Sequence, residues 1–162
     1  MNLKSYIVGT RFFDETPVTA TDPGYDNETW CIRTGIKVQP GKYTCVAWRG
    51  TERWRHEGKR RSRRRTMICA IYLDGKIPSQ EEWESMSIIG NIGVDAGLAG
   101  FFQNKPNYSN EEWLALCDKI ANKSWHITDE GFFTESGYGD GSYYVYGRKN
   151  NAGLYTALEI RF

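Results

Sequence analysis

Short strand-like segments recur along this chain, with turn-forming residues between them. These breaks are turn dipeptides or clusters: Pro40-Gly41, Asp74-Gly75, Asp140-Gly141 and Asn150 to Gly153. Asp-Gly in particular suits a two-residue hairpin turn, because both central residues of that turn need a positive φ. Eight segments are therefore predicted as strands: residues 3–9, 35–39, 42–48, 66–73, 87–94, 98–102, 141–147 and 154–162.

The composition favours a β-rich fold. Seventeen glycines and ten tyrosines suit a turn-rich β protein better than a helical bundle. Because short turns rather than crossover helices join most of the predicted strands, we expect antiparallel sheets packed as a sandwich or as a strongly bent meander. The predicted fold class is mainly β (α+β), in a single domain that covers residues 1–162.

One helix is predicted in the C-terminal half, at about residues 110–122. Ser109 is an N-cap candidate, and Glu112 completes a capping-box pair with it. Four residues at three- and four-residue spacing form its apolar face: Trp113, Leu116, Cys117 and Ile120. Asp26 and Ser79 are similar starts, each four residues before a tryptophan, and are expected to open at most a short turn. We interpret the tryptophans after all three starts as packing residues rather than as a ligand cage.

The stretch SGYGDGSYYVYG, residues 136–147, contains four glycines, one aspartate and a run of tyrosines. Asp140-Gly141 has the chemistry of a hairpin turn, so we interpret the stretch as the tip of a hairpin in a C-terminal meander. A ligand-binding role for the Asp140 carboxylate is the alternative.

The four cysteines are far apart in the sequence, and no Cys-x-x-Cys pair is present. Structural zinc sites usually have close ligand pairs, so we predict no metal site. Cys45 and Cys69 lie within predicted strands and are expected to be buried thiols in a reducing compartment. Because the Gly-x-Ser-x-Gly motif is absent and no histidine belongs to a motif, we assign no catalytic residue and no cofactor.

No apolar run approaches the length of about 20 residues that a membrane-spanning helix needs. The N-terminal residues also lack the layout of charge, apolar core and cleavage site that marks a secretory signal. We therefore expect a cytoplasmic protein without a membrane partner. The sequence leaves the oligomeric state open.

Positive charge is concentrated in one segment, from Arg49 to Arg65. It contains nine Lys or Arg and two Glu, a net charge of +7, whereas the whole chain carries +1 and the remainder therefore −6. Eleven charged residues in seventeen positions cannot be buried. Because the segment joins two predicted strands, we expect residues 49–65 to form a long hairpin connection or a projecting loop.

Three interpretations of this segment remain open. Arginine suits phosphate and aromatic rings stack on bases, which favours a platform for a nucleotide or for nucleic acid. The second interpretation is an acidic protein partner, and the third is a solvated loop that keeps a sheet edge soluble. We predict a non-enzymatic binding protein for an anionic ligand. The predicted ligand-binding residues are Arg53, Trp54, Arg55, Arg60, Arg61, Arg63, Arg64 and Arg65.

Asp22, Asp95 and Asp140 form a second candidate site. Carboxylates that converge can hold Mg²⁺ and support phosphoester hydrolysis, so a metal-dependent phosphoesterase is an alternative function. Asp22 precedes a proline, which suits a turn, and Asp95 precedes Ala96-Gly97, which suits a strand end or a bulge. A structural or immunity-type protein-interaction domain is a further alternative.

Four blocks of sequence together carry a family resemblance: TDPGYDNETWC (21–31), VQPGKYTCVAW (38–48), IGVDAGLAGFF (92–102) and FFTESGYGDGSYYVYG (132–147). Their order and content resemble a bacterial and phage family, domain of unknown function 4241. The resemblance covers most of the chain and implies a compact, mainly β domain, without an activity that can be transferred.

The resemblance places ten residues at family motif positions: Asp22, Tyr25, Trp30, Cys31, Asp95, Gly97, Gly139, Asp140, Gly141 and Tyr143. Two departures are clear. Gly24 stands where the family often has a cysteine, which argues against a thiol pair with Cys31. The connection after the second strand is usually short in the family, whereas here it is the basic segment.

Overall fold

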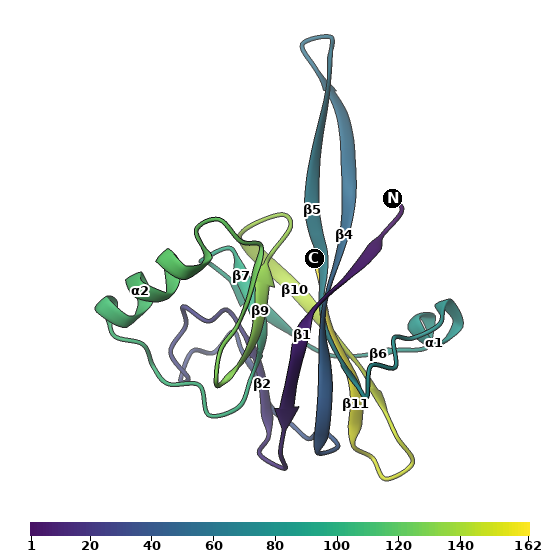
Figure 1. Ribbon diagram of the computed structural model, residues 1–162, viewed down its shortest axis with the longest axis vertical. Helices are drawn as coiled ribbons and strands as arrows, with labels where there is room; N and C mark the ends of the chain where they lie inside the picture. The colour runs from purple at the N-terminus through teal and green to yellow at the C-terminus, as the bar shows by residue number, and fades with distance from the viewer.

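Two antiparallel β-sheets make up most of the computed structural model, which describes residues 1–162 (Figure 1). Sheet A has six strands in the order β1 (Lys4–Phe13), β4 (Gly41–His56), β5 (Lys59–Leu73), β11 (Tyr155–Arg161), β10 (Gly141–Lys149) and β6 (Ser87–Val94). Sheet B has five strands in the order β3 (Arg33–Ile36), β2 (Val18–Thr21), β7 (Leu98–Phe102), β9 (Gly131–Glu135) and β8 (Trp125–Ile127). The predicted mainly β class with antiparallel sheets is confirmed.

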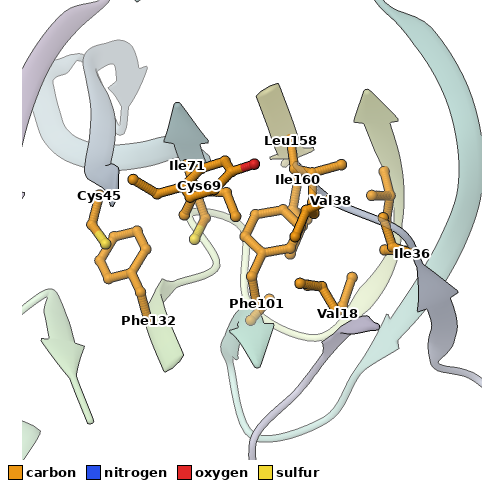
Figure 2. Close-up of a cluster of buried hydrophobic side chains, with 14 of the residues drawn as sticks. Val18, Ile36, Val38, Cys45, Cys69, Ile71, Phe101, Phe132, Leu158 and Ile160 are labelled. Atoms are coloured by element: carbon orange, nitrogen blue, oxygen red, sulfur yellow. The ribbon is translucent and has the colours of Figure 1, made fainter. Parts of the chain in front are cut away.

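The main hydrophobic core lies between the two sheets (Figure 2). Successive residues of a strand point to opposite sides of the sheet, so every second residue contributes to this core. In β7 and β9, for example, Phe101 and Phe132 pair with each other and point inward. Their neighbours Phe102 and Phe133 point outward instead, where helix α2 covers them. Burial of aromatic side chains on both sides therefore fixes sheet B between two apolar layers.

Helix α2 (Asn110–Ile120) begins where the sequence predicts it. The Ser109 hydroxyl accepts a hydrogen bond from the backbone N–H of Glu112 at 3.2 Å. The rings of Tyr108 and Trp113 lie 6.5 Å apart, as expected of a hydrophobic staple at a helix start. Leu116 then packs on the outward phenylalanines of sheet B, so local capping and tertiary packing act together.

Helix α1 (Gln80–Glu84) has a complete capping box between Ser79 and Glu82. It lies on the outer side of sheet A, away from sheet B (Figure 1), and Trp83 packs there on a second cluster. The start at Asp26 opens only the predicted short turn, in which the Thr29 N–H donates to the Asp26 carbonyl oxygen at 3.0 Å. The interpretation of Trp30 as a packing residue is wrong, because its surface is 93% exposed. Neither helix combines the length and the apolar character that a membrane span requires.

The interpretation of residues 136–147 as a hairpin tip is wrong, although the predicted C-terminal pairing of the last two strands, β10 and β11, is present. β9 pairs with β7 and β8 in sheet B, whereas β10 pairs with β6 and β11 in sheet A. The glycine-rich residues 136–140 therefore carry the chain from one sheet to the other. Gly139, at φ +83, supplies a backbone conformation that L side chains rarely adopt and so permits the sharp turn of the crossover.

Candidate functional site

Strands β4 and β5 extend beyond their neighbours as a two-stranded hairpin, residues 50–65, called here the basic arm (Figure 1). β1 pairs with β4 only as far as Arg49, and β11 pairs with β5 only as far as Ile68. The arm strands therefore pair only with each other. Glu57 and Gly58 form the turn, with φ values of +50 and +75, the left-handed conformation that a tight hairpin requires.

One extra residue at the root of the arm decides which way its side chains point. Trp48 pairs with Ile68, but Arg49 pairs with Thr66, so Met67 is an unpaired bulge residue in β5. Beyond this bulge, directly paired residues share a face and the two faces alternate along each strand. The outer face continues the side of β4 on which Trp48 packs, away from sheet B. The inner face continues the side of Arg49, toward sheet B.

Both faces of the arm are basic. The inner face carries Thr51, Arg53, Arg55, Arg60, Ser62 and Arg64. The outer face carries Glu52, Trp54, His56, Lys59, Arg61, Arg63 and Arg65. The arm therefore presents cations on both of its faces.

Arg65 differs from the other predicted ligand-binding residues because its guanidinium group is hydrogen-bonded within the fold, whereas that of Arg64 only lies over the Tyr6 ring, 4.7 Å from its centroid. It is half-buried, and its Nε donates to Oε2 of Glu52 at 2.6 Å. Its Nη1 donates to the carbonyl oxygen of Gly137 at 2.7 Å, and its guanidinium lies 5.0 Å from the ring centroid of Tyr138. Arg65 thus joins the arm to the glycine-rich crossover rather than being available to a ligand.

A second contact fixes the arm root to the same crossover. Arg49 Nη2 donates to Oε1 of Glu135 at 3.2 Å, and the Thr66 hydroxyl donates to the same oxygen, also at 3.2 Å. Both strands of the hairpin are therefore tied at their base to the end of β9. This arrangement holds the direction in which the arm projects.

Seven cations of the arm are exposed and form no ion pair: Arg53, Arg55, Lys59, Arg60, Arg61, Arg63 and Arg64. The only carboxylate of the arm besides Glu52 is Glu57, whose closest basic partner is His56 at 4.0 Å. Arg55 and Arg60 lie directly opposite each other across the two strands. Like charges in that position repel and destabilise the pairing, so the arm stores electrostatic repulsion that an anion would relieve.

Trp54 is the only Trp, Tyr or Phe on the arm, and its surface is 40% exposed. It lies directly opposite Arg61. An open depression runs along this part of the hairpin, lined by Arg53, Trp54, Arg55, Arg60, Arg61 and Ser62. The predicted site residues of the distal arm are thus brought together on one element.

Asp22, by contrast, has a structural environment. Its side chain is fully buried, and Oδ2 accepts hydrogen bonds from the backbone N–H groups of Asp95 at 2.8 Å and Ala96 at 2.6 Å. Oδ1 accepts from the N–H of Gly24 at 2.8 Å. Burial raises the pKa of this carboxyl, and the three N–H donors oppose the rise. Asp22 therefore ties two loops together through their backbones.

Asp95 and Asp140 lie close to each other but face solvent. Asp95 follows Val94, and Asp140 precedes Gly141, which pairs with Val94 across β6 and β10. Ser136 also donates its backbone N–H to the carbonyl oxygen of Gly97 at 2.8 Å, so three of the four blocks quoted for the family resemblance meet at this end of the sandwich. No group of three His, Cys, Asp or Glu side chains is arranged to hold a metal ion.

The cysteines are unpaired, as their spacing indicates. Cys45 and Cys69 are fully buried in the main core, and burial raises the pKa of the Cys45 thiol to about 12. Cys31 and Cys117 are half-exposed. The prediction of buried thiols in β4 and β5 is confirmed.

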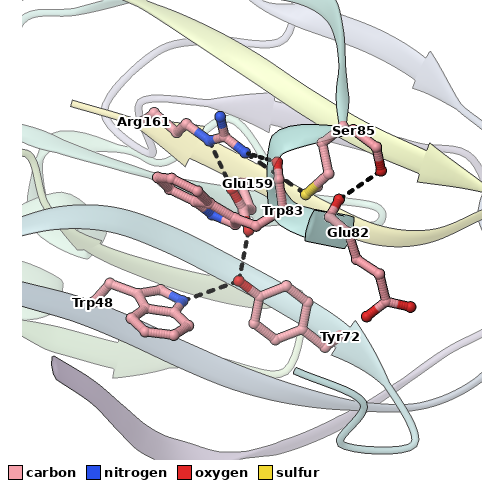
Figure 3. Close-up of polar contacts among 8 residues, drawn as sticks. Trp48, Tyr72, Glu82, Trp83, Ser85, Glu159 and Arg161 are labelled. Atoms are coloured by element: carbon pink, nitrogen blue, oxygen red, sulfur yellow. Dashed lines mark hydrogen bonds and ion pairs between the residues drawn. The ribbon is translucent and has the colours of Figure 1, made fainter. Parts of the chain in front are cut away.

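A buried carboxylate in β11 was missed by the sequence reasoning. Glu159 is fully buried, and its Oε1 accepts a hydrogen bond from the Tyr72 hydroxyl at 2.7 Å (Figure 3). Tyr72 in turn accepts from Trp48 Nε1 at 2.9 Å, and Arg161 Nε donates to Oε2 of Glu159 at 2.7 Å. The available signal is the position of Glu159 between Leu158 and Ile160, in a strand with apolar residues on both faces.

Comparisons of the chain with protein-family models, with curated proteins and with solved structures found no match. The resemblance to domain of unknown function 4241 stays a prediction. The role of the basic arm is therefore inferred from its geometry and charge.

Proposed function

We propose that this protein binds nucleic acid and that the basic arm is the binding element. The observation that carries the proposal is the set of seven exposed arm cations without a carboxylate partner. Phosphate groups supply the missing negative charge, and release of the counterions around a nucleic acid drives such binding. Arginine forks also match the geometry of phosphate oxygens.

The length of the arm favours a polymer over a single nucleotide. Each arm strand contributes seven paired residues, from Gly50 to His56 and from Lys59 to Arg65. At a rise of about 3.3 Å per residue, the arm projects roughly 23 Å. Cations distributed over that distance and over both faces fit a row of phosphates, whereas one nucleotide would contact only a few of them.

Repulsion within the arm supports the same proposal. A two-stranded hairpin without neighbours is marginally stable in water, and the opposed Arg55 and Arg60 weaken it further. A phosphate between these guanidinium groups replaces repulsion with attraction on both sides. Binding is therefore coupled to ordering of the arm.

The proposal is one of binding without catalysis. Arginine stays protonated at all physiological pH values, so the arginines of the arm cannot exchange protons with a substrate as acid or base. The other exposed ionisable side chains of the arm are His56, Glu57 and Lys59, all at its tip. The groups on the arm are thus suited to holding an anion in place.

Fluorescence anisotropy with short labelled oligonucleotides tests the proposal. The affinity should fall steeply between about 50 and 200 mM salt, because bound phosphates release counterions. Replacing Arg60, Arg61 and Arg63 together with Gln should weaken binding and lower the slope of log K against log salt by about two to three. The domain should remain folded, because all three side chains are exposed.

A matched control carries the same loss of charge away from the arm. Lys37, Lys119 and Lys123 are exposed residues of the body, and their triple replacement by Gln should leave affinity nearly unchanged. If both triple variants lost the same amount of oligonucleotide affinity, binding would depend on the net charge of the protein rather than on the arm, and the proposal would be wrong. Binding of poly-glutamate but not of oligonucleotides would also overturn it and would favour an acidic protein partner.

A further inference from the structure

We infer that the nucleic acid bound by the arm is single-stranded and that its bases stack at two aromatic positions on the outer face. These positions are Trp54 and a pocket lined by Trp48 and Trp83. The inference rests on the proposed function and adds the class of nucleic acid to it. In a duplex the base faces are covered by their neighbours, whereas in a single strand they are available to aromatic side chains.

Trp48 and Trp54 lie on one side of the same strand. The bulge at Met67 lies in β5, so β4 keeps its alternation, and every second residue from Trp48 onward points outward. At about 3.3 Å per residue, the two tryptophans are roughly 20 Å apart along β4. A short stretch of an extended strand therefore reaches both.

The pocket at the arm root is mainly apolar. It is lined by Met1, Leu3, Trp48, Pro78, Gln80 and Trp83. Its wall near the arm depends on Gly50, because a side chain there would collide with Met1 and Leu3. A planar, largely apolar group with polar edges suits such a pocket, and a nucleobase has this character. The basic arm next to it attracts the polymer that carries the base.

A buried hydrogen-bond network holds the two indole rings of this pocket. Trp48 donates to Tyr72, and Tyr72 donates to Glu159 (Figure 3). Arg161 donates from Nη2 to the backbone carbonyl oxygen of Trp83 at 3.0 Å, and its guanidinium lies 4.2 Å from the Trp83 ring centroid. The network therefore holds Trp48 through its indole N–H and Trp83 through its backbone and the face of its ring. Rings fixed in this way lose little freedom when a ligand binds, which favours stacking.

The residues between the two aromatic positions suit a phosphate backbone. Glu52 is the only carboxylate there, and its ion pair with Arg65 neutralises it. Arg63 lies opposite Glu52, and Arg61 lies opposite Trp54, both exposed and unpaired. When one base of a single-stranded nucleic acid stacks on Trp54 and another occupies the pocket, the phosphates between these bases lie beside Arg63 and Arg61. Aromatic rings interleaved with arginines are the arrangement that single-strand binding uses.

Three properties of the binding reaction follow. A single-stranded oligonucleotide should bind more tightly than the same sequence as a duplex. Trp54→Ala should weaken single-strand binding by roughly fivefold to a hundredfold, the range for one stacked base. Its salt slope should stay that of the unchanged protein, because no phosphate contact is removed. Trp30→Ala, at a tryptophan of the body that is even more exposed than Trp54, should change nothing.

The pocket itself is tested without a core substitution. Six indole N–H signals are available in a ¹H–¹⁵N spectrum, one for each tryptophan. Titration with a short single-stranded oligonucleotide should shift the signals of Trp48, Trp54 and Trp83. The signals of Trp30 and Trp113 serve as controls and should not move.

The outcomes separate this inference from the proposed function. Equal affinity for single strand and duplex, with Trp54→Ala silent and the Trp48 and Trp83 signals unmoved, would overturn the inference. In that case a loss of binding in the Arg60, Arg61 and Arg63 variant would leave nucleic-acid binding by the arm intact. If that variant bound normally, both would be wrong.

Discussion

Arg65 donates a hydrogen bond from Nη1 to the carbonyl oxygen of Gly137 at 2.7 Å and so joins the basic arm to the glycine-rich crossover between the two sheets. The two segments are 72 positions apart in the chain. In the sequence, one segment stands out for its charge and the other for its glycine content. Because of this contact, the root of the arm is held against the crossover, and the crossover helps to fix the direction in which the arm projects.

Replacing Gly137 with Ala should disturb this junction. A Cβ atom at Gly137 would collide with the carbonyl oxygen of Thr66 in β5. We expect the free energy of unfolding to fall by about 1–3 kcal/mol, the range for overpacking a tight site. Urea denaturation measures this change. Gly35→Asn is the control, because Gly35 has open space around it and Asn tolerates its φ of +69; a similar loss there would contradict the explanation.

Replacing Asp22 with Asn should destabilise the loops that its carboxylate joins. An amide has only one acceptor oxygen, so the N–H groups of Asp95 and Ala96 or that of Gly24 lose their partner. Leaving buried donors unpaired is expected to lower the free energy of unfolding by about 2 kcal/mol. Asp140→Asn, at an exposed carboxylate, should change it little. Chemical denaturation of the two variants measures both free energies of unfolding. An unchanged free energy of unfolding in Asp22→Asn would rule out the structural role of Asp22.

Glu159 should make stability depend on pH. Burial raises the pKa of its carboxyl above the ordinary 4.5, and the donors Tyr72 and Arg161 oppose the rise. The folded state then holds the proton more tightly than the unfolded state. The stabilising contribution of this group is therefore complete below the ordinary pKa and is lost as pH rises through the folded value.

Glu159→Gln removes this titration. The difference in the free energy of unfolding between the variant and the unchanged protein should vary with pH from about 4 upward, by at most about 1.4 kcal/mol per pH unit. Urea denaturation at a series of pH values measures it. Parallel pH profiles for the two proteins would show that the pKa of Glu159 is not raised.

The tip of the arm offers a change that should strengthen binding. Glu57 occupies a left-handed position, at φ +50, that Asn adopts more readily, and its carboxylate opposes an anionic ligand. Glu57→Asn should raise oligonucleotide affinity several-fold at low salt, since screening weakens the charge effect at high salt. Glu57→Gln removes the charge alone and should have a smaller effect. Anisotropy titrations compare the two, and weaker binding of both variants would contradict the expectation.

The thiols should divide into two classes of reactivity. Cys45 and Cys69 are fully buried, whereas Cys31 and Cys117 are half-exposed. A thiol reagent should label only Cys31 and Cys117 in the folded protein and all four cysteines in denaturant, because the thiolate and access to it are both required. Mass spectrometry locates the labels. Rapid native labelling of Cys69 would show that the core opens readily.

Local signals in the sequence were sufficient for several elements. Ser109 and Glu112 mark the start of α2 because a cap requires only residues within one turn. The solvent exposure of the arm also follows from the sequence, since eleven charges in seventeen residues cannot be desolvated. The candidate cations on the arm could thus be named, but no local pattern distinguishes Arg65 from the others, because its partner Gly137 lies 72 positions away.

Other features were decided only by the tertiary structure. Residues 136–140 have the chemistry of a hairpin turn, yet the strands on either side entered different sheets. Glu159 is fully buried on the outer side of sheet A. Trp48 and Trp83, which are far apart in the sequence, line the same pocket. The physical reason is that a strand edge offers the same N–H and C=O groups to any partner, so long-range packing of apolar faces, which short sequence patterns do not encode, selects which strands pair.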